Sequence, residues 1–211
     1  MTVRVVTPPA PIVAPGDIAG SHSSSDPKMA ALIQAVTEEI DGPTGWLGRS
    51  LGAQTLELTL PGFSCGRNFA LPFKPIIGIV SVTYLGADGV EQTVPQASYR
   101  LANERLWFAA GFAFPATACA PDAVRVRYKA GYNGTSGAEV GEVQTGPIPE
   151  RARQAIIISV QQMKALGAEN LFLRSEEVEG VGTRQWTVSE QAGQIVRQAS
   201  ERLLSTLRVY Q

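Results

Sequence analysis

Few residues of this chain have the types and spacing that enzymatic or metal-binding chemistry requires. Its single histidine is His22, and its two cysteines, Cys65 and Cys119, lie far apart in the sequence. Zinc sites in proteins need several nitrogen, sulfur or oxygen ligands, and nucleophilic catalysis commonly needs a base such as histidine beside a serine or cysteine. We therefore expect no metal site, and we expect the two cysteines to be free thiols in a reducing cytoplasm.

The other candidates for catalysis are equally weak. Glu38 and Glu39 are adjacent within a helical pattern, so their carboxylates point in different directions. The glycine-rich run 131–137 lacks the lysine of a phosphate-binding loop and does not lead directly into a helix. Glu150 and Arg151 are better explained by the start of a helix. We predict that the chain is not an enzyme and binds no cofactor.

The composition favours a folded chain with no bulk attraction to nucleic acid. Of its 211 residues, 44% are hydrophobic, which is enough for a substantial core. Only 18% are charged, and the formal net charge of −1 removes a general electrostatic case for binding DNA or RNA. The sequence has neither the pattern of a secretory signal nor an apolar run long enough to span a bilayer. We expect a soluble protein made in the cytoplasm.

Three segments have the periodicity of amphipathic helices. The first covers residues 26–40, with Asp26 or Ser25 as the cap and Pro27 at the first helical position. The second runs from Pro149 to Leu166, and the third from Ser189 to about Leu207. The apolar stripe of the first helix consists of Met29, Leu32, Ile33, Val36 and Ile40.

The second and third helices also carry apolar stripes. On the second helix, Ile157 and Val160 point away from the main stripe, so we expect this helix to be buried on more than one side, as a core helix or a subunit contact. Its main stripe consists of Ala152, Ala155, Ile156 and Met163. The stripe of the third helix consists of Ala192, Ile195, Val196, Ala199, Leu203 and Leu207.

Between the first and second helices the periodicity changes to two, which is typical of β-strands. Residues 53–60 alternate threonine or glutamate with leucine and predict a half-buried strand, with Glu57 on its polar side. Asp88-Gly89 is a hairpin turn signal. Further strands are predicted at 69–71, 76–85, 92–94, 99–101, 106–108 and 123–129. Short strands separated by turns favour an antiparallel sheet or a small barrel.

These elements predict an α+β fold with four parts. Residues 26–52 and 147–211 form a helical core, and 53–131 form an inserted antiparallel β region. Residues 1–25 are a proline-rich extended arm, which is either a poorly ordered terminus or an arm that lies on a neighbouring subunit. Residues 132–146 form a mobile glycine-rich loop. The polar run 167–186 is interpreted as a solvated loop, with Trp186 as an anchor at its end.

Two groups of residues allow both a structural and a functional interpretation. Trp107, Phe108, Phe112 and Phe114 fit either the core of a sheet with its turn or an exposed apolar tip that docks on a partner. Alternating basic residues at 125, 127 and 129 fit either a solvated strand face or, in several copies, a basic ring facing DNA or an acidic partner.

The order of these motifs supports a family resemblance over residues 25–166. The motifs are Leu71-Pro72 with Pro75, Tyr84 with Asp88-Gly89, Tyr99, Lys129-Ala130-Gly131-Tyr132 and Ile148-Pro149-Glu150, with a weaker echo at 199–204. In this order the chain resembles the head–tail connector (adaptor) proteins of tailed bacteriophages and gene transfer agents. The family is often described as phage head–tail connectors of the phiE125 gp8 type.

The resemblance implies a structural role in the neck of a virion or gene transfer agent particle, assembled in the bacterial cytoplasm. It implies a ring of about a dozen copies that contact the portal protein, tail or stopper proteins and each other through heterologous contacts. DNA would pass through the ring without sequence-specific contact, and no cofactor or membrane is implied. The expected portal or subunit interface consists of Ile157, Val160, Leu203, Leu207, Arg208, Val209 and Tyr210.

Two hypotheses from other classes remain open at this point. A monomeric ligand- or carbohydrate-binding β module with helical flanks would present an aromatic face around Trp107. A hydrolase with an unrecognised site would show convergent polar groups that the sequence does not reveal.

Overall fold

The chain forms two structural units. The computed structural model describes residues 2–20, 22–63, 66–136, 138–168, 175–178, 182–185 and 190–210. Residues 1–12, 38–148 and 207–211 belong to one unit, here called the β unit. Residues 13–37 and 149–206 belong to the other, here called the helical unit.

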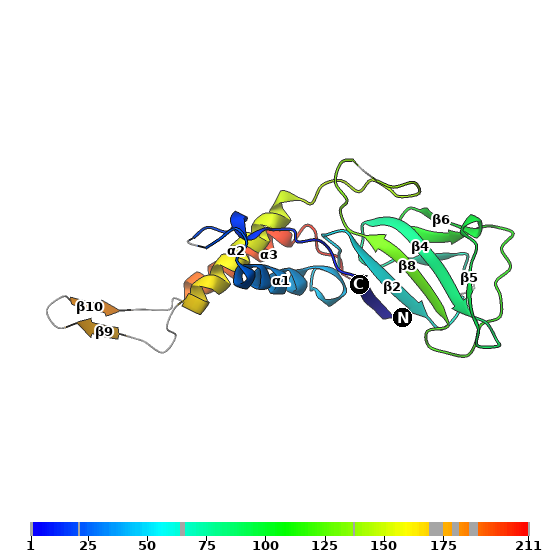
Figure 1. Ribbon diagram of the computed structural model, residues 1–211, viewed down its shortest axis with the longest axis horizontal. Helices are drawn as coiled ribbons and strands as arrows, with labels where there is room; N and C mark the ends of the chain where they lie inside the picture. The colour runs from blue at the N-terminus through cyan, green and yellow to red at the C-terminus, as the bar shows by residue number, and fades with distance from the viewer. Residues whose placement is uncertain are drawn as a thin grey trace. The chain divides into compact units, whose positions relative to one another are not determined.

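The β unit contains two antiparallel sheets (Figure 1). The larger sheet has the order β1-β2-β8-β4-β5. In it, β2 lies between the N-terminal strand β1 and β8, which comes much later in the chain. Its strands are β1 (Thr2–Thr7), β2 (Gln54–Leu60), β4 (Ile76–Leu85), β5 (Glu91–Thr93) and β8 (Val124–Ala130). The smaller sheet has the order β3-β7-β6, with β3 (Asn68–Ala70), β6 (Tyr99–Ala102) and β7 (Arg105–Phe108). Two short 3₁₀ turns, η2 (Gly42–Thr44) and η3 (Gln96–Ser98), lie in the connections.

The core of the β unit is built from alternating residues of both sheets. On β8, Val124, Val126 and Tyr128 are buried, while the basic residues between them are more exposed. They pack in one cluster with Leu106 and Phe108 of the smaller sheet. The alternation of apolar and polar residues in the sequence therefore corresponds to alternating buried and exposed side chains in the strand. Burial of the apolar side chains between the two sheets stabilises their packing.

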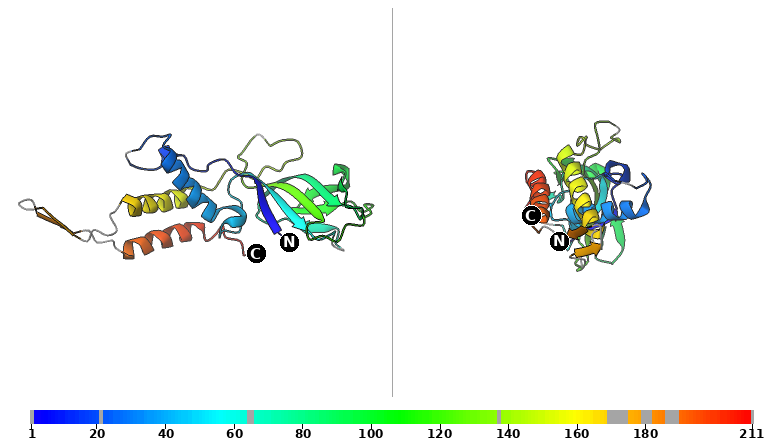
Figure 2. Two further views of the ribbon diagram at one scale, coloured as in Figure 1. Left: turned by 60° about the horizontal axis from the view of Figure 1, so that its bottom comes forward. Right: turned by 90° about the vertical axis from the view of Figure 1, so that its left-hand side faces the viewer.

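The helical unit contains α1 up to Thr37, two further helices and a short hairpin. The helices are α1 (Pro27–Ile40), α2 (Glu150–Ala168) and α3 (Glu190–Leu204), with the 3₁₀ turn η1 (Pro15–Asp17) before them. Figure 2 shows α2 (yellow) and α3 (red) side by side, and the Gln162 side chain of α2 donates a hydrogen bond to the Gly193 carbonyl of α3. The antiparallel hairpin consists of β9 (Ser175–Val178) and β10 (Gly182–Gln185). The predicted α+β class is confirmed.

The start of α1 follows its sequence signals. The Asp26 carboxylate accepts hydrogen bonds from the Lys28 N–H at 2.9 Å and the Met29 N–H at 3.4 Å. These are donors that a helix leaves unpaired at its first turn. The predicted stripe of α1 is largely buried, with Leu32 only half-buried and the fully covered members being Met29, Ile33, Val36 and Ile40.

Several predictions about the connecting segments were wrong. Residues 2–7 are extended, as expected, and form a strand paired with β2 of the same chain, a pairing that the sequence analysis did not predict. Parts of the predicted solvated loop 167–186 belong to the end of α2 and to the β9–β10 hairpin. The third helix ends at Leu204 and not near Leu207. Trp186, Ser189 and Cys65 lie outside the described residues, and Cys119 is an exposed free cysteine.

Hydrogen bonds and ion pairs connect the base of the glycine-rich loop to the larger sheet. Asn133 and Thr145 exchange hydrogen bonds, including Thr145 N–H to the Asn133 side-chain oxygen at 2.8 Å. The Val143 N–H donates to the Ile77 carbonyl of β4 at 2.7 Å. Lys129 of β8 reaches Glu142 at 2.6 Å and Glu139 at 3.2 Å. These contacts connect the loop, apart from its undescribed Gly137, to the larger sheet.

A buried carboxylate organises the segment between α1 and β2. Asp41 is only 6% exposed, and it accepts hydrogen bonds from the backbone N–H groups of Leu51 at 2.6 Å and Gly52 at 3.4 Å. Burial raises the pKa of Asp41 to about 6, although these hydrogen bonds oppose the shift.

The stability of the protein should therefore depend on the protonation of Asp41. The native state holds this proton more tightly than the unfolded chain, so the contribution of Asp41 is most favourable at low pH and is lost as the pH rises through about 6. The shift from 3.8 to about 6 corresponds to about 3 kcal/mol. The unfolding free energy of the wild type minus that of Asp41→Asn, measured by urea denaturation, should fall between pH 4 and pH 7.5. Parallel curves for the two proteins would contradict the assignment.

Candidate assembly surfaces

The seven residues predicted to form an interface are divided between the two units. Ile157, Val160 and Leu203 belong to the helical unit, and 207–210 belong to the β unit. Each group is therefore a separate candidate surface.

On α2, the two predicted interface residues have different environments. Val160 is 0% exposed and lies four residues after Ile156 and eight after Ala152, which are equally buried. It therefore belongs to the main stripe rather than to a second face, and it is covered within its own chain. Ile157 is half-buried. Met163, which the sequence placed in the buried stripe, is 42% exposed.

On α3, the buried face is rotated relative to the predicted stripe. Leu204 and Ser200 are buried and Leu203 is half-buried, whereas Ala199 is exposed and Ile195 is 64% exposed. Some apolar residues of α3, including Ile195 and Ala199, are thus not covered by the rest of the chain. These residues are available to a partner.

The C-terminal segment, residues 207–210, lies against the turn that follows α1. The Val209 N–H donates a hydrogen bond to the Leu47 carbonyl at 2.9 Å. Gly48 has a φ of +68°, and a Cβ at this position would collide with the Val209 carbonyl oxygen. A glycine is therefore required here by both the backbone conformation and the close approach of the segment.

Arg208 lies between two aromatic rings. Its guanidinium carbon is 5.4 Å from the centre of the Trp46 ring and 4.7 Å from that of Tyr210, which are cation–π distances. Tyr210 is 82% exposed. Arg208 is exposed, and among the described residues no carboxylate pairs with it. We call Trp46, Arg208 and Tyr210 the aromatic–arginine cluster.

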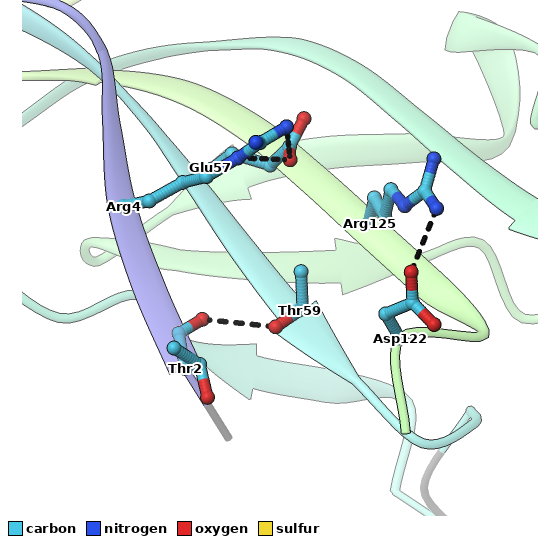
Figure 3. Close-up of a pocket in the computed structure, with 6 residues that line it drawn as sticks. All are labelled: Thr2, Arg4, Glu57, Thr59, Asp122 and Arg125. Atoms are coloured by element: carbon cyan, nitrogen blue, oxygen red, sulfur yellow. Dashed lines mark hydrogen bonds and ion pairs between the residues drawn. The ribbon is translucent and has the colours of Figure 1, made fainter. Parts of the chain in front are cut away.

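The outer face of the larger sheet carries ion pairs rather than a basic surface (Figure 3). The Glu57 carboxylate is 1% exposed and receives Arg4 at 2.6 Å on one oxygen and Arg127 at 2.6 Å on the other. Burial alone would raise the pKa of Glu57, but the hydrogen bonds from Arg127 and Arg4 hold it below its ordinary value. The sequence placed Glu57 on the polar side of a half-buried strand and missed its burial.

The neighbouring basic residues are paired in the same way. Arg125 contacts Asp122 at 2.7 Å and Glu91 at 2.9 Å, and Lys129 contacts the two glutamates of the glycine-rich loop. A shallow depression of about 300 Å³ on this face is lined by two of the ion pairs, Arg4 with Glu57 and Arg125 with Asp122 (Figure 3). Because carboxylates neutralise the basic residues, this face does not fit the hypothesis of a basic ring facing DNA.

The aromatic residues that allowed two interpretations are packed. Phe108 is buried, and its ring stacks on Phe112 at 5.1 Å and meets Phe114 edge to face at 5.2 Å. Trp107 is half-buried, and its indole N–H donates to the Ala102 carbonyl at 3.1 Å. The packed arrangement favours the core interpretation over an exposed tip or a carbohydrate-binding face.

The described ranges contain no cluster of three residues suited to hold a metal ion. Within the same ranges, no helix combines the length and hydrophobicity needed to cross a membrane.

Comparison with solved structures identifies the fold. The chain is similar to a chain from the neck of a native gene transfer agent (GTA) particle determined with C12 symmetry, with a TM-score of 0.61 and 17% identity. It is also similar to a chain from the neck of an empty GTA particle with C6 symmetry, with a TM-score of 0.62 and 18% identity. A chain from the virion of a native GTA particle has a TM-score of 0.62 and 16% identity. Each alignment covers 100% of this chain and 97% of the other. No protein-family model and no curated protein sequence matches the chain.

Proposed function

We propose that this protein is a structural component of the neck of a tailed phage or gene transfer agent particle. In this role it is a head–tail connector that forms a ring between the portal protein and the tail or stopper proteins. The observation that carries the proposal is the similarity of fold to neck chains over the whole length of both proteins. At this level of identity the similarity establishes the fold, and the function is inferred from it.

The proposed ring is a homo-oligomer of about a dozen copies, by analogy with the symmetry of the similar necks. Ring closure requires two different faces of one subunit to match. The low charged fraction of 18% and the uncovered apolar residues Met163 and Ile195 support burial of surface in an assembly. DNA passes through the ring without sequence-specific contact, and assembly takes place in the bacterial cytoplasm.

The aromatic–arginine cluster is the proposed contact with the portal. Tyrosine, tryptophan and arginine are enriched among residues that dominate binding energy, and here one of each is stacked at the C-terminal segment. Leu207 and Val209 complete this surface. Ile157 and Leu203, both half-buried, are proposed to contact a neighbouring subunit, whereas the complete burial of Val160 gives it a role in the core.

Native mass spectrometry tests the proposed assembly. The purified chain should be measured alone and after mixing with the portal protein encoded with it. We expect a complex that contains one portal ring and about a dozen copies of this chain, by analogy with the C12 symmetry of the similar neck. A chain that remains unbound at micromolar concentrations of portal would contradict the proposal.

A further inference from the structure

We propose that β1 is exchanged between subunits when the ring forms, so that β1 of each copy pairs with β2 of its neighbour. The inference rests on the proposed ring and specifies a contact that closes it. Its occupant is the N-terminal strand of a second copy of this chain.

The first argument is that β1 makes few contacts with the core of its own chain. Of its six residues, only Val3 is partly buried, and the other five are exposed. Elements with few buried apolar contacts open at a much smaller free energy than global unfolding. β1 can therefore leave the sheet while the two sheets keep their shared core.

The second argument is the segment that follows β1. Pro8, Pro9 and Pro11 fix the backbone in an extended conformation. Four residues in this conformation, 8–11, span about 12 Å at about 3.1 Å per residue. Ile12, directly after them, is the last residue of this segment in the β unit and is buried, so the segment 8–11 connects β1 to a packed residue of its own unit.

The third argument is that the contacts of β1 can be made equally well to another copy. Arg4 pairs with Glu57, the Thr59 hydroxyl donates to the Thr2 carbonyl at 3.2 Å, and the ladder joins Thr2–Thr7 to residues 55–59 (Figure 3). After departure of β1, Glu57 keeps its partner Arg127. Exchange of an identical element requires no new complementarity, since the same contacts form between chains.

The fourth argument is symmetry. A donated strand and an accepting sheet edge are different surfaces of one subunit. Their contact is heterologous, which is the kind of contact that closes a ring of more than two copies. The Arg4–Glu57 ion pair, with its acceptor buried, would define the register of the donated strand.

Cysteine cross-linking tests the exchange in the full chain. Thr2 and Thr59 are paired in register, and Cα separations in antiparallel pairs, about 4.5–5.5 Å, fit a disulfide. In a background with Cys65→Ser and Cys119→Ser, one protein carries Thr2→Cys and a second carries Thr59→Cys. The two are mixed, assembled on the portal, oxidised and separated under non-reducing conditions. We expect covalent heterodimers from rings and none from the unassembled mixture.

The double variant Thr2→Cys/Thr59→Cys provides the matched control. Exchange predicts disulfides within single chains before assembly and covalent multimers after assembly. Rings that contain only intrachain disulfides and no heterodimers would overturn the exchange while leaving the proposed ring intact. If the mixed variants do not assemble, deletion of residues 2–7 decides the question, because exchange predicts a chain that folds but forms no ring. A ring of normal size from the deleted chain would overturn the inference.

Discussion

Val160→Asp should lower the free energy of unfolding by about 3–5 kcal/mol, because it places a carboxylate at a fully buried apolar position. Val160 is 0% exposed on α2, one helical turn from the equally buried Ile156. Folded domains have stabilities of about 5–15 kcal/mol, so this loss would be a large fraction of the stability of a typical domain. Urea denaturation followed by circular dichroism at 222 nm measures the effect.

Ile157→Asp is the matched control, since it introduces the same carboxylate one residue away on the same helix. Ile157 is half-buried, so the new charge can reach water and the cost should be about 1 kcal/mol. If Ile157 contacts a neighbouring subunit, this variant should fold and fail to form rings. Equal destabilisation by the two substitutions would show that the burial pattern assigned to α2 is wrong.

Removal of the last four residues, by a stop after Leu207, should weaken binding to the portal by about 30-fold or more. The truncation deletes Arg208 and Tyr210, residue types enriched among binding hot spots, and the loss of one hot spot of about 2 kcal/mol corresponds to about 30-fold. It also removes the Val209–Leu47 hydrogen bond but no strand of either sheet. The isolated chain should therefore keep its thermal midpoint within a few degrees, and binding can be measured by biolayer interferometry on immobilised portal.

Single substitutions separate the role of the C-terminal segment from a general loss of charge. Arg208→Ala should cause most of the loss of portal binding that the truncation causes, because it removes the guanidinium between Trp46 and Tyr210. Arg202→Ala removes an exposed arginine from the last turn of α3, outside the aromatic–arginine cluster, and should bind normally. Full binding by the truncated chain would exclude this segment as the portal contact.

Local sequence signals predicted most of the regular elements correctly. Asp26 and Pro27 mark the start of α1 because capping involves neighbours within three residues. The bounds of β4 were predicted without error, since a run of apolar β-branched residues ends at a turn with Asp88-Gly89. The run Thr2–Thr7 has an equally strong β composition, but the prolines that follow it obscured this signal.

The sequence could not predict features that depend on distant partners. The burial of Glu57 requires Arg4 and Arg127, which come from strands far away in the chain. The role of Trp46 and Gly48 depends on a C-terminal segment more than 150 positions later. The packing of α2 determines which apolar residues of α3 are buried, and the sequence of α3 alone does not. Spacing along one helix identifies an apolar face, but the neighbouring elements determine its exposure.

The most direct test of the connector role is a cryo-electron microscopy reconstruction of the neck of the particle that contains this protein. The account predicts a ring of this chain between the portal and the tail, with the aromatic–arginine cluster in contact with the portal. It also predicts density that joins β1 of one subunit to β2 of the next. A neck whose density below the portal is fully explained by other proteins would contradict the account.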